Sequence, residues 1–163
     1  MTQDILKVLI GPEEIAQAVR ELGARVSEDY RGKNLLLVSV LKGSVVFMAD
    51  LMRAITIPAS IDFMAVSSYG HSTRSSGVVK IVKDLDLPLG SYDLLVVEDI
   101  LDSGKTLSYL TKMLRDKGAR SVRVAALLDK PDRRVADITP DYCCFTVPDE
   151  FVVGYGLDFA EKY

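Results

Sequence analysis

Three carboxylates and a turn of small residues lie close together in the middle of the chain. The apolar run 94–97 is followed directly by Glu98 and Asp99, and Asp102 precedes the turn at 103–106, Ser-Gly-Lys-Thr. Because this turn opens a predicted helix, its backbone N–H groups and two hydroxyls offer an anion site at a helix N-terminus. A phosphate cradle beside fixed carboxylates suits a ligand with both phosphate and sugar hydroxyls, bound together with a metal ion. The pattern therefore favours a phosphorylated sugar over a simple anion.

A nucleoside-triphosphate P-loop is the obvious alternative, and its spacing does not fit. The P-loop motif that ends like Gly104-Lys105-Thr106 needs a glycine five positions before Gly104, where this chain has Asp99. Asp, Ser and Gly are also common in ordinary turns and helix caps. The adjacent carboxylates at the end of a buried strand favour a ligand site, because charges are rarely placed there for packing.

Size and composition indicate a single globular domain over residues 1–163. The chain is 48% hydrophobic, yet no apolar run approaches the ~20 residues of a membrane span. The N-terminus contains Asp4 and no basic segment, so we expect no signal peptide and a cytoplasmic location without a membrane partner. The net charge of −3, with no basic block, argues against nucleic acid as a partner.

The two cysteines, Cys143 and Cys144, are adjacent in an apolar, strand-like run. Neighbouring side chains on a strand point to opposite faces, so this pair is poorly placed for a disulfide bond or a metal site. We expect both to be buried, small apolar side chains.

Apolar runs alternate with helical periodicities along the chain. Gly11 and Pro12 mark a helix start, and apolar residues then recur at helical spacing from Ile15 to Val26. The polar, Gly/Ser-rich stretch 68–77 is predicted to be a mobile loop. Strands alternating with helices indicate an α/β fold with a mostly parallel sheet. The predicted strands are 35–41, 61–67, 78–82, 92–97, 122–128, 142–147 and 151–153, and two more helices are predicted, over 45–55 and from the turn to 118.

Polar or charged residues follow several of the predicted strands. Lys42 and Gly43 follow the first strand, the three carboxylates follow strand 92–97, and Lys130 follows strand 122–128. In parallel α/β sheets ligands bind beyond the carboxyl ends of the strands. We therefore expect these groups to meet at one edge of the sheet, and their convergence is stronger evidence for a site than any one of them.

These blocks resemble the hypoxanthine (hypoxanthine-guanine) phosphoribosyltransferases, a family with the type I phosphoribosyltransferase fold. The run 96–106, V-V-E-D-I-L-D-S-G-K-T, looks like the family's phosphoribosyl pyrophosphate signature, which by itself marks any phosphoribosyltransferase. The block 148–158 restricts the resemblance to the phosphoribosyltransferases that act on 6-oxopurine bases. The implied fold is a mostly parallel central sheet flanked by helices, with a small hood formed by terminal segments. The other matching blocks, in the family's order, are 41–43, 68–69, 127–130 and 148–158.

The reaction that the resemblance implies belongs to purine salvage. A purine nitrogen attacks C1′ of phosphoribosyl pyrophosphate, which gives IMP, and GMP when the base is guanine, and releases pyrophosphate. The implied partners are phosphoribosyl pyrophosphate and a 6-oxopurine base, with Mg²⁺ as cofactor and a homodimer or homotetramer as the assembly.

The resemblance also implies a role for each matching residue. Pyrophosphate would bind the backbone of Lys42 and Gly43, where the peptide bond before Lys42 is often cis in the family. Mg²⁺ would be held by Glu98, Asp99 and Asp158, of which Asp158 acts mostly through water. The ribose hydroxyls and the 5′-phosphate would be bound by Glu98, Asp99, Asp102, Ser103, Gly104, Lys105 and Thr106.

Four residues would act on the purine base. Asp102 would be the general base toward N7, and Lys130 would donate to the 6-oxo oxygen and so select oxopurines over adenine. Phe151 would stack on the purine ring, and the backbone of Val152 would read its edge.

Ser68 and Tyr69, with the loop after them, would close over the site and exclude water. His71 receives no role, and Arg133 and Arg134 are expected at the surface or at a subunit interface. Without the resemblance, ordinary structural roles stay open for Lys42 and Asp158 as cap or turn residues, for Lys105 and Lys130 as solvated or structural lysines, and for Phe151 as a core residue.

Two other functions stay open at this point: a related enzyme that prefers xanthine, and a non-catalytic, nucleotide-sensing regulator. Lys130 with Phe151 and Val152 argues against adenine or a pyrimidine, and the acidic balance argues against an RNA-binding regulator. The family chain usually continues past Tyr163 with an arginine that contributes to pyrophosphate binding; this sequence does not contain that residue, which leaves its pyrophosphate affinity open.

Overall fold

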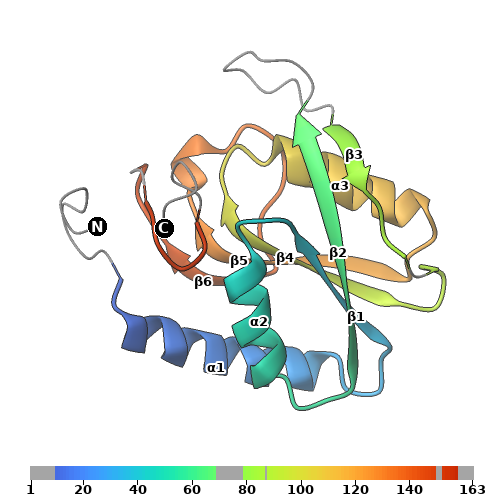
Figure 1. Cartoon of the computed structure of the whole chain (residues 1–163), viewed down its shortest axis with the longest axis horizontal. Coiled ribbons are helices and arrows are strands. Elements are labelled where there is room, and N and C mark those ends of the chain that lie inside the picture. Colours follow the sequence, from blue (N-terminus) through green and yellow to red (C-terminus); the bar gives the residue numbers. More distant parts are fainter. Residues whose placement is uncertain (1–9, 69–78, 87, 150–151, 158–163) are drawn as a thin grey trace.

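The computed structural model describes residues 10–68, 79–86, 88–149 and 152–157. Within these ranges the chain forms a six-stranded sheet with helices on both faces (Figure 1). None of the helices in this part of the chain has the length and apolar character needed to cross a bilayer. In chain order the elements are α1 (Pro12–Asp29), β1 (Leu35–Val40), α2 (Val45–Ala54), β2 (Ala59–Ser68), β3 (Val79–Lys83), β4 (Asp93–Leu101), α3 (Lys105–Asp116), β5 (Ser121–Asp129), the 3₁₀ helix η2 (Pro131–Arg133) and β6 (Tyr142–Thr146).

The strand order is β3-β2-β1-β4-β5-β6. All neighbouring pairs are parallel except β2 and β3, which are antiparallel at one edge. The predicted α/β class with a mostly parallel sheet is therefore confirmed. Leu35 at the start of β1 lies opposite Asp93 of β4, and Leu101 at the end of β4 lies opposite Asp129 of β5. This register places the carboxyl ends of β1, β4 and β5 side by side.

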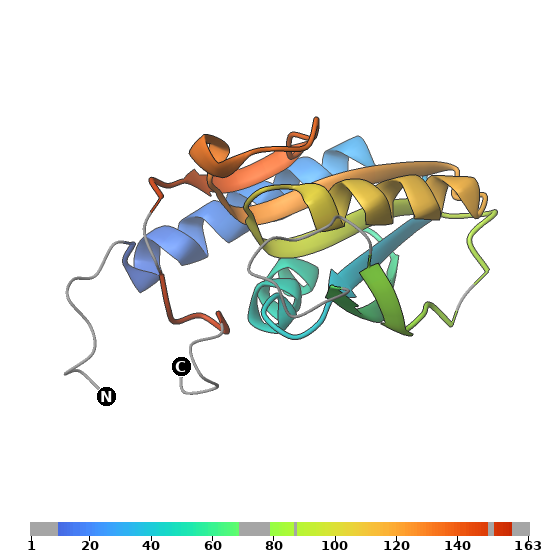
Figure 2. The ribbon, with the colours of Figure 1, turned by 90° about the horizontal axis from the view of Figure 1, so that it is seen from above.

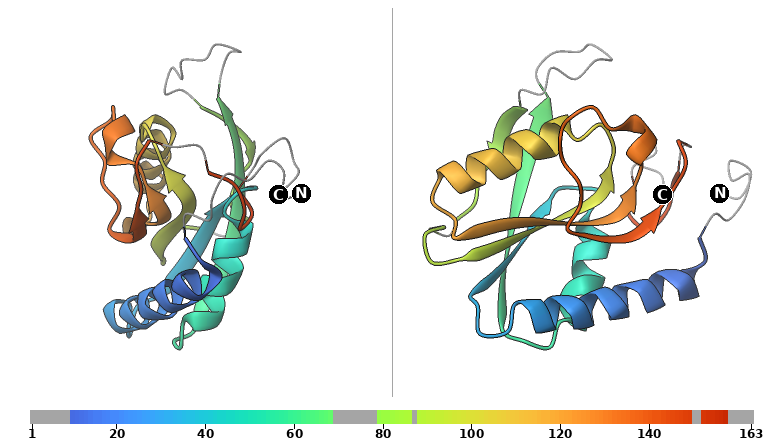
Figure 3. Two further views of the ribbon diagram at one scale, coloured as in Figure 1. Left: turned by 90° about the vertical axis from the view of Figure 1, so that its left-hand side faces the viewer. Right: turned by 180° about the vertical axis from the view of Figure 1, so that it is seen from behind.

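Alternate side chains of the central strands pack into two apolar layers. Leu35 and Leu37 of β1 pack in one layer with α1 and α2, whereas Leu36 of β1 packs in the other with α3. The ribbon views show α1 and α2 on one face of the sheet and α3 on the other (Figures 2 and 3). The two helices of the first layer approach closely, because a Cβ atom on Gly23 of α1 would lie only 2.6 Å from the carbonyl oxygen of Ala54. The sheet is thus covered on both faces, which leaves its edges and strand ends for ligands.

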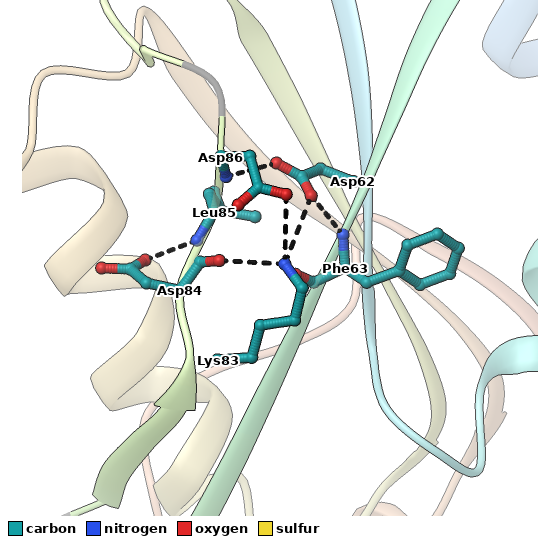
Figure 4. Close-up of polar contacts among 6 residues, drawn as sticks. All are labelled: Asp62, Phe63, Lys83, Asp84, Leu85 and Asp86. Carbon is teal, nitrogen blue, oxygen red and sulfur yellow. Dashed lines mark hydrogen bonds and ion pairs between the residues drawn. The ribbon is translucent and has the colours of Figure 1, made fainter.

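A buried carboxylate fixes the residues that follow β3. Asp62 of β2 is 6% exposed and accepts hydrogen bonds from two backbone N–H groups, one of them that of Asp86 at 2.8 Å (Figure 4). Lys83 Nζ lies 3.8 Å from Asp62 Oδ1. Asp84 forms an ion pair with Lys117, just beyond α3, at 2.6 Å. These contacts attach the segment after β3 to β2 on one side and to the end of α3 on the other.

Three details differ from the predictions. The strand predicted over 92–97 continues through the carboxylates to Leu101, because β5 pairs with it along this length. In the described part of 151–153 there is no strand: Val152 packs against the core outside the sheet. Cys143 and Cys144 are only partly buried, because β6 is an edge strand, so the expected full burial is wrong.

Candidate active site

Two adjacent carboxylates lie near the carboxyl end of β4. The backbone N–H of Asp99 donates to Glu98 Oε1 at 3.1 Å, and the N–H of Ile100 donates to Asp99 Oδ1 at 2.7 Å. Burial, followed by the neighbouring Asp99 carboxyl, raises the pKa of Glu98 well above its ordinary value. A cation or a pair of hydroxyl donors placed against these oxygens would relieve the repulsion between them.

The pair fits Mg²⁺ in its donor chemistry. Mg²⁺ prefers oxygen ligands and is commonly held by one or two carboxylates, with water and substrate phosphates completing its shell. Among the residues that the structure describes, no group of three or more candidate ligands comes together, so Glu98 and Asp99 are the protein ligands available there. Asp158, the third expected ligand, lies outside the described residues.

The turn after β4 leads directly into α3. Gly104 is the N-cap of α3 with φ of +82°, a left-handed conformation that favours glycine. The N–H of Lys105 points toward Ser103 Oγ at 3.5 Å. The first N–H groups of a helix have no partner within the helix, so the start of α3 is a place where an anion could accept hydrogen bonds. Ser103 and Thr106 are partly exposed beside those donors.

The segment 134–138 contacts the backbone of this turn, and the sequence does not predict these contacts. Arg134 Nε donates to the carbonyl oxygen of Asp102 at 3.1 Å, and its guanidinium also forms an ion pair with Asp129. The N–H groups of Val135 and Ala136 both donate to the carbonyl oxygen of Ser103, at 2.9 and 3.1 Å. The Arg134 side chain is 13% exposed, so its expected surface position is wrong.

Arg133 contacts the carboxylate of Asp102 itself. Its Nε lies 2.6 Å from Asp102 Oδ1, and its Nη1 donates to Asp149 Oδ1 at 3.1 Å. The side chain is 50% exposed, so it does lie at the surface as expected, but it is bound to a residue of the site. The one feature of the sequence that could have indicated this contact is the position of Arg133 in a short turn that begins with Pro131 and follows a predicted strand.

The loop after β1 lies against the carboxylates of β4. The Leu41–Lys42 peptide bond is cis, as the resemblance implies. Gly43 lies so close to Asp99 that an added Cβ atom would be 2.1 Å from Oδ2. Gly156 lies against the other side of this loop, because its own Cβ atom would be 3.3 Å from the carbonyl oxygen of Gly43. The backbone of the predicted pyrophosphate loop is therefore held between β4 and the C-terminal segment.

Lys130 follows β5, next to the end of β4. Its N–H donates to the carbonyl oxygen of Leu101 at 3.0 Å, and the residue is 7% exposed. A solvated strand-end lysine is thereby excluded. Val152 and Tyr155 pack against the core, and the Tyr155 hydroxyl donates to Asp50 of α2.

The structure thus brings most of the predicted residues to one edge of the sheet. Gly43, Glu98, Asp99, the turn 102–106 and Lys130 come from neighbouring strand ends. Ser68 ends β2, and Tyr69, Phe151 and Asp158 lie outside the described residues. Of the implied hood, residues 152–157 are described and include a bridge between Gly154 and Leu157. The arrangement offers oxygen ligands, an anion cradle and a buried lysine within one site.

Comparisons with known proteins agree with this geometry. Residues 10–160 match the phosphoribosyl transferase domain family. The hypoxanthine-guanine phosphoribosyltransferase of Streptococcus mutans is 55% identical over 163 residues, which span 100% of this chain and 91% of that protein. The protein of the same name from Bacillus subtilis is 54% identical with the same coverage. A crystal structure of a hypoxanthine phosphoribosyltransferase from Staphylococcus aureus superposes with a TM-score of 0.97 at 48% identity, covering 100% of this chain and 89% of that one.

Proposed function

Because the chain belongs to the hypoxanthine-guanine phosphoribosyltransferase family, we propose that this site joins the 5-phosphoribosyl group of phosphoribosyl pyrophosphate to hypoxanthine or guanine. The products are IMP or GMP and pyrophosphate, so the enzyme serves purine salvage. The observation that carries the proposal is the arrangement of the turn that begins α3, which follows the Glu98–Asp99 pair at the end of β4 and lies beside the buried Lys130.

The phosphoribosyl group is held from two sides. The N-terminal N–H groups of α3 and the hydroxyls of Ser103 and Thr106 bind the 5′-phosphate. Glu98 and Asp99 bind the ribose hydroxyls, and Lys42 with Gly43 bind the pyrophosphate through their backbone. Mg²⁺, held by Glu98, Asp99 and Asp158 when bound, supplies positive charge that favours departure of the pyrophosphate.

The transfer itself needs a proton acceptor on the protein. A purine nitrogen forms the new bond to C1′ while the bond from C1′ to the pyrophosphate oxygen breaks, and the pyrophosphate takes the bonding electrons. The purine then carries one proton too many, and the carboxylate of Asp102 takes it from N7. General-base catalysis of this kind contributes about 10²–10⁴ in rate.

Selection of the base rests on Lys130. Its ammonium group donates to the 6-oxo oxygen of hypoxanthine or guanine, whereas adenine has an amino group, another donor, at that position. Two donors that face each other in a buried site form no hydrogen bond, so the site rejects adenine. Phe151 stacks on the ring and the Val152 backbone contacts its edge.

We further propose a single domain over residues 1–163, a homodimer or homotetramer as the assembly, and the cytoplasm as the location. Light scattering on the purified chain distinguishes a dimer from a tetramer, and a monomer would contradict the proposed assembly.

The test of function is nucleotide formation from phosphoribosyl pyrophosphate and Mg²⁺ with hypoxanthine, guanine, xanthine and adenine in parallel assays. Turnover with hypoxanthine or guanine, and none with adenine, is expected. Lys130→Ala should lose most turnover with oxopurines, whereas Lys112→Ala, an exposed lysine of α3, should not. Turnover mainly with xanthine would revise the substrate, and nucleotide binding without turnover would favour a regulator.

A further inference from the structure

We propose that Arg133 is a positioning residue for the proton acceptor: it holds one oxygen of the Asp102 carboxylate and leaves the other for the purine. This inference rests on the role proposed above for Asp102. Arg133 Nε lies 2.6 Å from Asp102 Oδ1, an ion pair without the linear geometry of a hydrogen bond. Oδ1 has almost no accessible surface, although the Asp102 side chain is 46% exposed. The exposed part of the side chain therefore excludes Oδ1, and we assign the proton-accepting role to Oδ2.

The chain fixes Asp102 at two points with two consecutive arginines. Arg134 Nε binds the backbone carbonyl of Asp102 at 3.1 Å, and Arg133 binds its carboxylate. Both arginines follow Lys130 in one short turn, which is closed by a hydrogen bond from Arg133 N–H to the Lys130 carbonyl at 3.1 Å. The residue that reads the 6-oxo oxygen and the residue that orients the proton acceptor are thereby placed by the same turn.

A second carboxylate keeps the Arg133 guanidinium from rotating away. Its Nη1 donates to Asp149 Oδ1 at 3.1 Å while its Nε faces Asp102. A planar guanidinium spreads its charge over two sides, so it can hydrogen bond to one carboxylate and pair electrostatically with the other, whereas a lysine ammonium is a single point charge. Asp149 also belongs to the C-terminal block that contains Phe151 and Val152, so Arg133 connects the proposed base to the purine-binding segment.

The Arg133–Asp102 contact should matter more for the orientation of the Asp102 carboxylate than for the stability of the fold. Arg133 and Asp149 are both at least half exposed, and ion pairs between exposed side chains contribute little to folding stability. A misplacement of about 1 Å at a reacting group, by contrast, can lower the rate by about 10²-fold. Loss of Arg133 should therefore leave the fold intact and lower the rate.

The experiment compares Arg133→Ala, Arg133→Lys and Arg31→Ala in hypoxanthine turnover. Arg31 pairs with Glu28 at 2.7 Å on an exposed surface, so its variant removes a similar ion pair away from the site. For Arg133→Ala we expect kcat to fall about tenfold, with the KM for phosphoribosyl pyrophosphate within twofold of wild type. Arg133→Lys should recover part of the loss, and Arg31→Ala should match wild type.

The decisive measurement is the effect of Arg133→Ala on kcat in a protein that already carries Asp102→Ala. If Arg133 acts through Asp102, Arg133→Ala should cause no further loss in that background. A similar loss in both backgrounds, or a kcat for Arg133→Ala equal to or above that of wild type, would overturn the inference. If Arg133→Ala does not fold by circular dichroism, Asp149→Asn tests the same point, and an unchanged kcat there contradicts it. If the wild-type protein makes no nucleotide, both the proposed function and this inference are wrong. If the wild-type protein is active and the Arg133 variants match it, only this inference is wrong.

Discussion

Gly43 and Asp99 are packed so closely that no side chain fits between them: a Cβ atom on Gly43 would lie 2.1 Å from Asp99 Oδ2. We predict that Gly43→Ala forces Asp99 or the loop to move and weakens phosphoribosyl pyrophosphate binding by about tenfold or more, because small displacements of binding groups are costly. The KM for phosphoribosyl pyrophosphate measures this. Gly90→Ala is the matched control, since nothing lies within 4 Å of its added Cβ atom, and an equal KM for both variants would contradict the prediction.

Gly104 should tolerate no side chain either, for two separable reasons. Its φ of +82° strains any L-residue, and an added Cβ atom would lie 2.5 Å from Ile138 Cγ2. Gly118→Ala carries only the first cost, because its φ is +100° with open space around it. We expect Gly118→Ala to lose about 1 kcal/mol of unfolding free energy and Gly104→Ala about 1–3 kcal/mol more. Chemical denaturation measures both, and equal losses would show that the Ile138 contact relaxes freely.

Glu98 should lower the stability of the ligand-free protein at neutral pH. Its pKa is raised in the folded state, so the stability that it contributes is present below its ordinary value of 4.5 and is lost as the pH rises through the folded value. Glu98→Gln stays neutral throughout. We expect equal melting temperatures near pH 4.5 and a variant that is more stable at pH 8 by on the order of 1 kcal/mol.

Thermal melts without Mg²⁺ or substrate test this pH dependence. Glu28→Gln, which removes an exposed, ion-paired carboxylate, serves as the control and should show a nearly constant difference from wild type. A Glu98→Gln protein no more stable than wild type at pH 8 would mean that the charge is well solvated there.

Asp62 should matter for stability although it lies away from the site. Its carboxylate is 6% exposed and accepts hydrogen bonds from two backbone N–H groups at 2.8 Å, so Asp62→Ala removes the acceptor of two part-buried donors. We expect a loss of about 2–4 kcal/mol of unfolding free energy. Asp84→Ala removes a half-exposed ion pair with Lys117 and an exposed hydrogen bond from the N–H of Leu85, and it should cost less than about 1 kcal/mol. Denaturant titration compares the two, and similar losses would contradict the argument.

The sheet and helices were predictable because their signals are local. The run 35–41 is apolar throughout, and β1 is buried at every position, as a central parallel strand must be. The segment 151–153 has the same apolar character, but Val152 packs as part of a loop over the core. The apolar composition of 151–153 predicts that the segment is buried. It does not predict that the segment pairs with a strand, because pairing requires a free sheet edge beside it.

The site was predictable where it consists of strand ends, and not where it depends on contacts between distant segments. Glu98, Asp99 and Lys130 follow from the rule that parallel strands share an edge for ligands. Arg134 could not be found in this way, because its partner is the backbone carbonyl of Asp102, 32 positions earlier. Every residue has a backbone carbonyl, so the sequence does not indicate which carbonyl a side chain will bind. Contacts of this kind can be identified only in the folded structure. The roles assigned to the individual site residues remain predictions.

The position of Gly43 between Asp99 and Gly156 couples two segments that are far apart in the sequence. Asp99 near the end of β4 and Gly156 in the C-terminal segment both lie against this one short stretch of backbone. A ligand that shifts the backbone of Gly43 would change the energy of both contacts. Two ligands that each move this backbone would therefore alter each other's affinity, and thermodynamic linkage requires the factor to be the same in both directions.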